Sequence, residues 1–408
     1  MTPAASRTAW LVVALLWPVA LLNYLDRQML ATMKSSMVGD ITGITSDAQW
    51  GFVLASFKWV YAVLSPVGGY IADRFSRRHV IAVSLFVWSL VTWLTGHVTN
   101  YNELIAARAL MGISEAFYIP AALALISDFH LGPTRSRAVG LHQTGIYIGL
   151  IIGGFAGHAA DSPNLGWRWA FSAAGLVGVI YAFPLFRYLK NPPRGADAAG
   201  GSLTPIRAAG ELFSNRNFLL LVLYFTLPAI AGWVIKDWMP VILKEQFKLS
   251  QGRAGVIAVL YVQIATICGA LAGGLLADWW MRRNERGRIY VSAIGMTLFL
   301  PALFGLGNPG TIGFAILFLI LFGIGWGFFD CNNMPILCQI TRPELRATGY
   351  GVMNLVSISC GGFGDWGFGV LKSQGVPLTL IFGCFTGVAL LSLVIVLLIR
   401  PAREQSSK

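Results

Sequence analysis

Long blocks of apolar residues, separated by short polar segments, run along the whole chain. Blocks of about 20 residues have the length that an α-helix needs to cross the hydrocarbon core of a bilayer. The pattern predicts twelve such spans, with approximate limits at 9–33, 49–72, 79–98, 102–126, 137–158, 167–189, 215–240, 254–278, 288–306, 311–335, 346–370 and 376–399. We therefore expect an all-α membrane protein with twelve transmembrane helices.

One long polar stretch interrupts this pattern near the middle of the chain. It contains the sequence Asn-Pro-Pro-Arg-Gly at 191–195 and a Gly-Gly-Ser run at 200–202, a composition typical of flexible linkers. The stretch divides the spans six and six. We predict an N-terminal six-helix bundle, a cytoplasmic linker and a C-terminal six-helix bundle, at 1–190, 191–214 and 215–408.

Composition and charge distribution support a membrane protein. The chain is 56% hydrophobic and 12% charged, whereas soluble domains carry roughly 25% charged residues. The net charge of +12 invites a nucleic-acid interpretation, but the basic residues follow the topology: 20 of the 30 Lys and Arg fall in segments on one side, and six in loops on the other. By the positive-inside rule, both termini are predicted to be cytoplasmic, with no nucleic-acid partner.

The two halves of the chain contain matching motifs in the same order. The pairs are Gly69–Arg78 with Gly274–Arg283, Gly112–Pro120 with Gly327–Pro335, and Arg137–Gly140 with Arg346–Gly349, at offsets of 205, 215 and 209 residues. A duplicated six-span unit explains this order. Parallel repeats about an axis along the membrane normal are found in one large class of secondary transporters.

Two acid and base pairs lie inside predicted spans: Asp26 and Arg27 in the first, and Arg108 and Glu115 in the fourth. A charge within the bilayer is costly and is usually retained for a function. Arg108 and Glu115 are two helical turns apart and so share one helix face. They could be ion pairs that only join helices, but small residues suffice for that. We favour a coupled proton and anion site.

Lys58 lies in the middle of the second span. Its side chain could snorkel to the interface, but its depth favours a cavity lysine that meets an anion. The pair Lys236 and Asp237 lies near one end of the seventh span, where snorkelling or a mutual gate pair is favoured over substrate contact. The remaining polar candidates for substrate binding are His142, Gln143, Tyr147, Asp330, Asn332, Asn333 and Asn354, with Ser357 and Asp365 also on the eleventh span.

Two alternatives stay open among these side chains. His142 is as well explained by a satisfied buried histidine as by a substrate-binding group. The aromatic residues Trp59, Trp233, Trp326 and Tyr147 could stack on a sugar ring, although packing is the commoner role of an aromatic side chain in a membrane span.

The segment Gly69–Arg78 resembles the signature between the second and third spans of the major facilitator superfamily, with Ser76 where that family usually has glycine. The resemblance implies two six-helix bundles that rock around a central site. The repeat of the segment at Gly274–Arg283 favours a gating latch over a turn that only sets topology, since topology needs no aspartate. The residues of this latch and its repeat are Gly69, Asp73, Arg74, Arg77, Asp278 and Arg282.

Several stretches resemble, more narrowly, the anion:cation symporter family and its hexuronate and sugar-acid carriers. They are Asn23–Gln28, Ser46–Gly51, Gly112–Ala116 with Pro120, Gly166–Trp169 and Trp238–Lys244. The resemblance implies that Asp26 and Glu115 couple protons, that Arg108 tunes Glu115, and that Arg27 and Tyr24 contact the substrate. Burial opposes ionisation of Glu115 and a nearby arginine favours it, so this carboxyl group can load and release a proton.

The expected function is proton-driven symport of a small organic anion, such as a sugar acid, with sodium as the other candidate ion. The alternative is a proton-coupled carrier of lysolipids or other amphipathic molecules resembling the Spinster group, which shares the Asp-Arg pair of the first span and the Arg and Glu of the fourth.

We expect no enzymatic activity, no cofactor and no metal site. We expect the first span to be retained, and the protein to be a monomer in a bacterial inner membrane. The five cysteines are expected to be apolar fillers.

Overall fold

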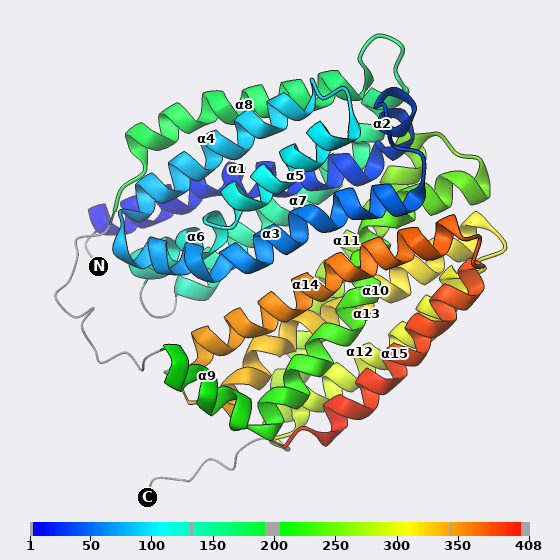
Figure 1. Ribbon diagram of the computed structural model, residues 1–408. Coiled ribbons are helices and arrows are strands. Elements are labelled where there is room, and N and C mark those ends of the chain that lie inside the picture. The colour runs from blue at the N-terminus through cyan, green and yellow to red at the C-terminus, as the bar shows by residue number, and fades with distance from the viewer. Residues whose placement is uncertain (1–2, 131–133, 192–204, 343–344, 401–408) are drawn as a thin grey trace, which may run out of the picture. The chain divides into compact units, whose positions relative to one another are not determined.

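A computed structural model describes residues 3–130, 134–191, 205–342 and 345–400, which are almost entirely helical (Figure 1). The helices are α1 (Pro3–Thr32), α2 (Lys34–Asp40), α3 (Asp47–Arg74), α4 (Arg77–Thr95), α5 (Tyr101–Glu115), α6 (Tyr118–Phe129), α7 (Arg135–Asp161), α8 (Gly166–Tyr188), α9 (Pro205–Ser214), α10 (Arg216–Phe247), α11 (Gln251–Met281), α12 (Gly287–Leu306), α13 (Ile312–Ile340), α14 (Arg346–Ser373) and α15 (Leu378–Leu398).

Each of the twelve predicted spans coincides with a long helix or, for the fourth, with the pair α5 and α6. Within the described residues, eleven segments are long and apolar enough to cross a membrane. Helix α14 is not among the eleven, because its polar residues lower its mean hydropathy, but its 28 residues reach about 42 Å. The prediction of an all-α membrane protein is confirmed.

The chain forms two compact units. The first comprises Met1–Gly195, Ile235–Val259 and Asp365–Val370; the second comprises Ala196–Val234, Leu260–Gly364 and Leu371–Lys408. Helices α10, α11 and α14 therefore contribute a segment to each unit. The boundaries at 190 and 215 that we expected between two bundles stay a prediction.

In the first unit, α7 approaches α1 closely because glycines line the facing side of α7. A Cβ atom at Gly145 would lie 2.7 Å from the carbonyl oxygen of Trp17, and one at Gly153 would lie 2.7 Å from that of Leu25. Gly149 faces Leu21 in the same way. This spacing of four residues forms a small-residue stripe that allows backbone-to-backbone contact, and it fixes the face of α1 next to Asp26 and Arg27.

Other pairs of helices in the first unit also pack closely. Helix α4 packs along α8, and the two lie side by side in Figure 1. Helix α3 packs along α5, where a Cβ atom at Gly112 would lie 2.7 Å from the carbonyl oxygen of Phe57. The start of α3 is set by a capping box between Ser46 and Gln49, which satisfies backbone donors at the helix end.

The fourth predicted span is broken into α5 and α6 at Ala116 and Phe117. Pro120 has no backbone N–H, so it cannot donate to the carbonyl of Ala116 four residues earlier. That carbonyl oxygen instead lies against Gly68 of α3, where a Cβ atom would be 2.5 Å away. The break places Glu115 at the last position of α5.

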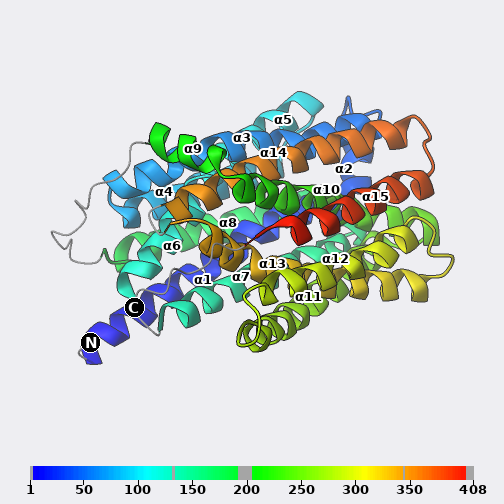
Figure 2. The ribbon, with the colours of Figure 1, turned by 90° about the horizontal axis from the view of Figure 1, so that it is seen from below.

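The second unit is built around α12, which packs against α13 and α15 (Figure 2). Its interior holds a cluster of rings in which Phe299, Trp326 and Phe329 contact one another at centroid distances of 5.3 to 6.3 Å. Phe225 stacks on Phe329 at 5.8 Å. Trp326 therefore has a packing role in this unit.

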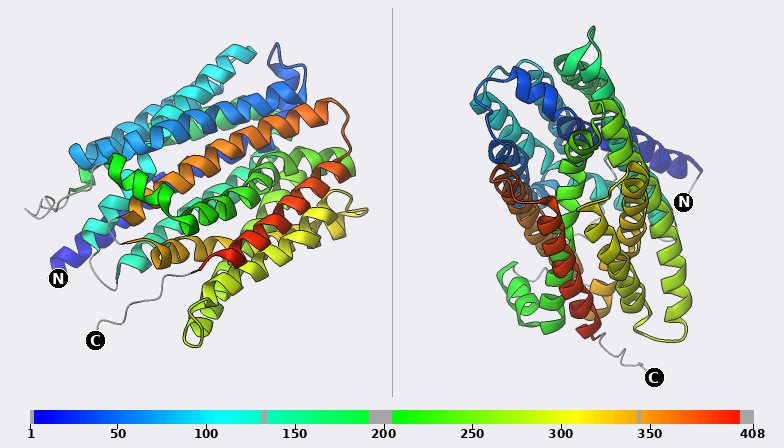
Figure 3. Two further views of the ribbon diagram at one scale, coloured as in Figure 1. Left: turned by 60° about the horizontal axis from the view of Figure 1, so that its bottom comes forward. Right: turned by 90° about the vertical axis from the view of Figure 1, so that its right-hand side faces the viewer.

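Two short helices were not predicted. Helix α2 follows α1 directly, and its first residue Lys34 pairs with Asp47 at the start of α3. Helix α9 occupies the second part of the segment for which we expected a flexible linker, and Figure 3 shows it leading into α10. Leu212 of α9 is buried and Glu211 pairs with Arg342, so tertiary contacts hold this segment as a helix. Residues 192–204 of the predicted linker lie outside the described residues.

Candidate functional site

The charged residues of α1 and α5 meet in the interior of the first unit. The Arg27 side chain donates from Nε to Oε2 of Glu115 over 2.7 Å, and its Nη2 lies 2.5 Å from the same oxygen. Nη2 of Arg27 also lies 3.2 Å from Oδ1 of Asn23, one helical turn away. The Glu115 side chain is fully buried and that of Arg27 is 14% exposed. Neither charge is directed freely into lipid.

Aromatic rings surround the Arg27 guanidinium. Its Cζ atom lies 4.8 Å from the ring centroid of Tyr24, 4.6 Å from that of Phe57 and 4.9 Å from that of Tyr61. The Arg108 guanidinium lies 4.5 Å from the same Phe57 ring. Ring faces attract cations, and more strongly where water is excluded. Phe57 thus holds the two guanidinium groups within one partly aromatic pocket.

Asp26 is buried at 2% exposure beside this pair. Its Oδ2 accepts a hydrogen bond of 3.1 Å from the Thr92 hydroxyl of α4. Among the described residues, its Oδ1 has no hydrogen-bond partner. Asp26 interacts electrostatically with Arg27, Arg108 and Glu115. Two acids and two bases therefore share one interior, where the protonation of one acid changes the field at the other.

Lys58 differs from the expectation of a cavity lysine free to meet an anionic substrate. Its ammonium group forms ion pairs with both Asp237 of α10 and Asp365 of α14. Whether Lys236 snorkels or forms a gate pair with Asp237 stays a prediction. Three segments far apart in the sequence meet at this lysine, and only the folded chain brings them together.

The candidates on α7 are distributed over different environments. His142 is fully buried, and its Nε2 lies 2.8 Å from the hydroxyl of Tyr118, which donates to the carbonyl oxygen of Leu16. The other ring nitrogen, Nδ1, is buried and has no hydrogen-bond partner among the described residues, so the polar atoms of this histidine are only partly satisfied. Gln143 is exposed and Tyr147 is half-buried.

Most candidates of the second half lie in the second unit, whereas Asp365 belongs to the first. Asn332 and Asn333 are buried, and Nδ2 of Asn332 donates to the carbonyl oxygen of Phe328 over 3.0 Å. The side chain of Asn333 has no hydrogen-bond partner among the described residues. Asn354 is half-buried, whereas Asp330 is exposed. Asp330, the repeat partner of Glu115, is therefore not an interior carboxylate.

The expected gating residues are only partly described. Gly69, Asp73 and Arg74 lie near the end of α3, and their side chains lie outside the described part of the chain. Arg77 pairs with Asp128 near the end of α6, a partner that no motif in the sequence indicated. In the repeat, Asp278 and Arg282 are exposed.

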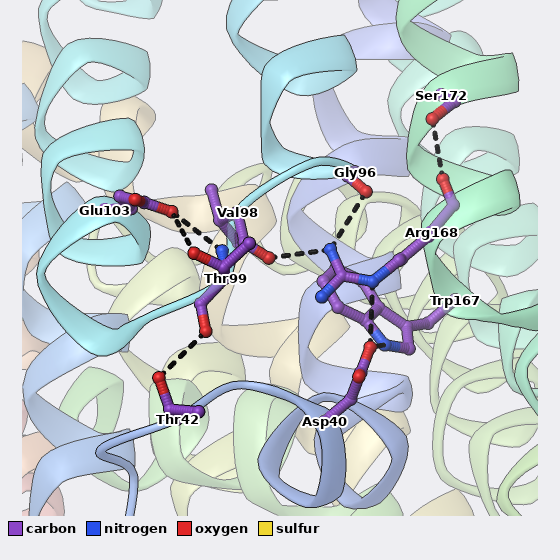
Figure 4. A network of polar contacts seen from close by, with 9 residues as sticks. All are labelled: Asp40, Thr42, Gly96, Val98, Thr99, Glu103, Trp167, Arg168 and Ser172. Atoms are coloured by element: carbon purple, nitrogen blue, oxygen red, sulfur yellow. Dashed lines mark hydrogen bonds and ion pairs between the residues drawn. The ribbon is translucent and has the colours of Figure 1, made fainter.

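A second polar network ties together helix ends of the first unit (Figure 4). Oδ2 of Asp40 accepts from Nε1 of Trp167 over 3.0 Å and from Nε of Arg168 over 2.8 Å. Nη1 of Arg168 also donates to the carbonyl oxygens of Gly96 and Val98. The Gly-Trp-Arg-Trp motif in the first turn of α8 thus connects this helix with α2 and with the residues that follow α4.

Comparison with known proteins identifies the family. The sequence profile described as the Major Facilitator Superfamily matches residues 16–364. The protein belongs to this superfamily. It is 27% identical over 382 residues to the protein spinster of Drosophila melanogaster, covering 89% of this chain and 61% of that protein. It is 31% identical over 363 residues to spinster homolog 1 of Homo sapiens, covering 83% and 68%.

Solved structures share the fold. A bacterial homolog of the human lysosomal transporter Spinster, in an inward-facing and unoccupied conformation, has a TM-score of 0.76 at 20% identity, covering 98% of this chain and 95% of that one. A D-xylose-proton symporter has a TM-score of 0.73 at 15% identity, covering 96% and 98%. These likenesses establish the major facilitator fold.

The superfamily prediction is thus confirmed, and the protein is a multi-pass membrane transporter and not an enzyme. The narrower resemblance to the anion:cation symporters is not supported, because both of these relatives are Spinster proteins. The Asp-Arg pair of the first span and the Arg and Glu of the fourth belong to both expected groups, so these four residues could not separate them.

Proposed function

We propose that the protein is a proton-coupled secondary transporter of an organic anion that works by alternating access. The observation that carries this proposal is the pair between Arg27 and Glu115. While Glu115 is ionised, it occupies the guanidinium and competes with an anionic group of the substrate. Protonation removes the charge of Glu115 and makes Arg27 available, so proton and anion bind together.

In this mechanism Asp26 and Arg108 control how readily Glu115, in its pair with Arg27, binds and releases a proton. Asp26 offers a second carboxyl group in the same interior, to which a proton can pass when Glu115 releases it. Arg108 supplies a positive charge that both acids experience. A transporter needs such a reversible site, because the proton must be bound on one side of the membrane and released on the other.

Of the two substrate classes that we considered, we favour an anionic amphipathic molecule such as a lysolipid over a small sugar acid. The ammonium of Lys58, which we had assigned to a small anion, is bound by two aspartates. The relatives that the chain matches are Spinster proteins, the group whose resemblance implied amphipathic substrates.

The coupling role is tested with Glu115→Gln in vesicles. We expect loss of accumulation driven by a pH gradient, whereas counterflow exchange persists, because glutamine keeps the shape of the site but carries no titratable proton. Glu103→Gln is the matched control on the same helix, since Glu103 is exposed and its carboxylate accepts from the backbone N–H of Thr99, just before α5. Intact accumulation by Glu115→Gln would show that the coupling assignment is wrong.

The substrate class is tested by thermal unfolding of the purified protein with lysolipids, sugar acids and monocarboxylates. A ligand that binds the folded state raises its stability in proportion to the logarithm of its concentration over the dissociation constant. We expect stabilisation by lysolipids and not by uronates. Vesicle transport with an imposed sodium gradient, compared with a pH gradient, distinguishes the two coupling ions.

We further propose that the protein resides in a bacterial inner membrane as a monomer with both termini in the cytoplasm, and that Arg77 and Asp128 belong to a cytoplasmic gating latch. The charge bias of the loops supports this orientation. Single cysteines placed beside Arg77 and beside Arg168 test it in whole cells, because an impermeant thiol reagent should label only the second.

A further inference from the structure

A buried lysine with two carboxylate partners lies apart from the Arg27 and Glu115 pair. The ammonium of Lys58 contacts Oδ2 of Asp237 and Oδ2 of Asp365. The side chains are 5%, 11% and 0% exposed, respectively. We call these three residues the Lys58 triad. All three lie in the first unit, on α3, α10 and α14.

The two carboxyl groups of the Lys58 triad lie close to each other. Both Oδ2 atoms contact the same ammonium nitrogen, so the carboxyl groups face each other across the lysine. The Oδ1 atom of Asp365 is buried and has no donor among the described residues. Two ionised carboxylates repel each other at such a distance, whereas a carboxylic acid can donate to a carboxylate. The arrangement therefore fits a pair of carboxyl groups that holds one proton.

Two further cations lie on helices of the first unit. Arg108 of α5 acts electrostatically on Asp237 but also on Asp26 and Glu115. Lys236 of α10 is half-buried, with its ammonium 6.0 Å from the Tyr24 ring centroid. Within the triad itself, one ammonium faces two carboxyl groups, which leaves an excess negative charge unless a proton is bound.

Close packing holds the triad in place. A Cβ atom at Gly51 of α3 would lie 2.6 Å from the carbonyl oxygen of Asp365, so the two backbones touch. Next to Lys58, the ring of Trp59 meets that of Trp366 edge to face at 6.5 Å. The carboxyl group of Asp365 is thus fixed against α3 and has little freedom to turn toward water.

We propose that Asp237 and Asp365 form a second proton-binding site, in which the two carboxyl groups share one proton beside the ammonium of Lys58. The ligand is a proton, because the ammonium already supplies the central positive charge and a proton needs no coordination shell. As a step of the transport cycle, the site rests on the proposed function. Its release of the proton leaves two repelling carboxylates, which loosens the contact of α3 with the segments of α10 and α14 in the first unit.

Infrared spectroscopy of the purified full-length protein tests the site without any substrate. A buried carboxylic acid has a carbonyl stretch distinct from that of a carboxylate, and it shifts in deuterated water. We expect such a band at neutral pH in the wild type and its loss in both Asp365→Asn and Asp237→Asn, because either change leaves one carboxylate beside one ammonium. Asp47→Asn is the matched control, since Asp47 pairs with a different lysine, Lys34.

The outcomes separate this inference from the coupling role of Glu115. A band that is lost in the two triad variants and kept in Glu115→Gln and Asp47→Asn supports the second site. A band that is the same in both triad variants as in the wild type, or its absence from the wild type, overturns it. Neither result depends on transport, whereas failure of the proposed function appears as proton-driven accumulation by Glu115→Gln.

Discussion

The segments Gly112–Pro120 and Gly327–Pro335 occupy equivalent positions in the two halves of the sequence, yet they differ in structure. In the first, the helix breaks four residues before the proline, and Glu115 is buried at the break. In the second, α13 continues through Pro335, and Asp330 is exposed. The same motif therefore holds an interior acid in one unit and a surface acid in the other.

The interiors of the two units differ in the same way. Among the described residues, the buried Asp, Glu, Lys and Arg side chains all belong to the first unit: Asp26, Lys34, Lys58, Arg108, Glu115, Asp237 and Asp365. The second unit has neutral polar groups and a cluster of aromatic rings. Both units therefore share the packing of apolar helices, but the buried charged side chains are concentrated in the first unit.

The largest expected effect is that of Arg27→Met in the charged interior. It leaves Glu115 buried without its partner, and breaking a buried pair in this way costs about 3–5 kcal/mol. We expect thermal unfolding at a markedly lower temperature and loss of transport. Arg77→Met is the control, because its pair with Asp128 is partly exposed and such pairs contribute about 0–1 kcal/mol. Equal losses in both variants would contradict the contrast between interior and surface charges.

The next effect concerns close helix packing at glycine, which both repeats use. Gly112→Ala and Gly327→Ala should each reduce the free energy of unfolding by about 1–3 kcal/mol, because the added methyl group meets the backbone of the adjacent helix. Gly383→Ala in α15 is the control, since a Cβ atom there would have nothing within 4 Å. Thermal unfolding in detergent measures all three. A neutral result for either repeat glycine would show that its helix can shift aside.

A smaller difference should separate hydrogen bonds in the two units. Thr92→Val removes a donor to the carboxyl group of Asp26, whereas Ser392→Ala removes a donor to the carbonyl oxygen of Tyr224. A bond to an ionised group contributes about 1 kcal/mol more than a neutral one. We expect the first variant to be the less stable and to change the pH profile of transport. The reverse order would indicate that the proton resides on Asp26.

The smallest effect is expected for Asp330→Asn. The side chain is exposed, so unfolding temperature and proton-driven accumulation should both be unchanged within the precision of the measurement. This variant is the repeat counterpart of Glu115→Gln, and together they measure how far the chemistry is confined to the first unit. Loss of accumulation in Asp330→Asn would assign a coupling role to the second unit as well.

Much of the fold could be predicted from residue order. The apolar blocks placed every long helix, because burial in hydrocarbon depends on composition over about 20 residues. Asp26, Arg27, Arg108 and Glu115 were identifiable by their cost inside those blocks. Thr92 and Asp128 were not, since a single threonine within a span and an Asp near a helix end have many ordinary roles.

Sequence by itself determined which segments enter the membrane and which charges need an explanation there, because both follow from local composition and solvation. Only the tertiary structure decided which charged side chains pair with one another. Glu115 and Arg27 are 88 residues apart, and Lys58 meets an acid 307 residues away. Such pairings depend on which helix faces touch, and glycine stripes and a proline break set those faces through contacts that no local pattern specifies.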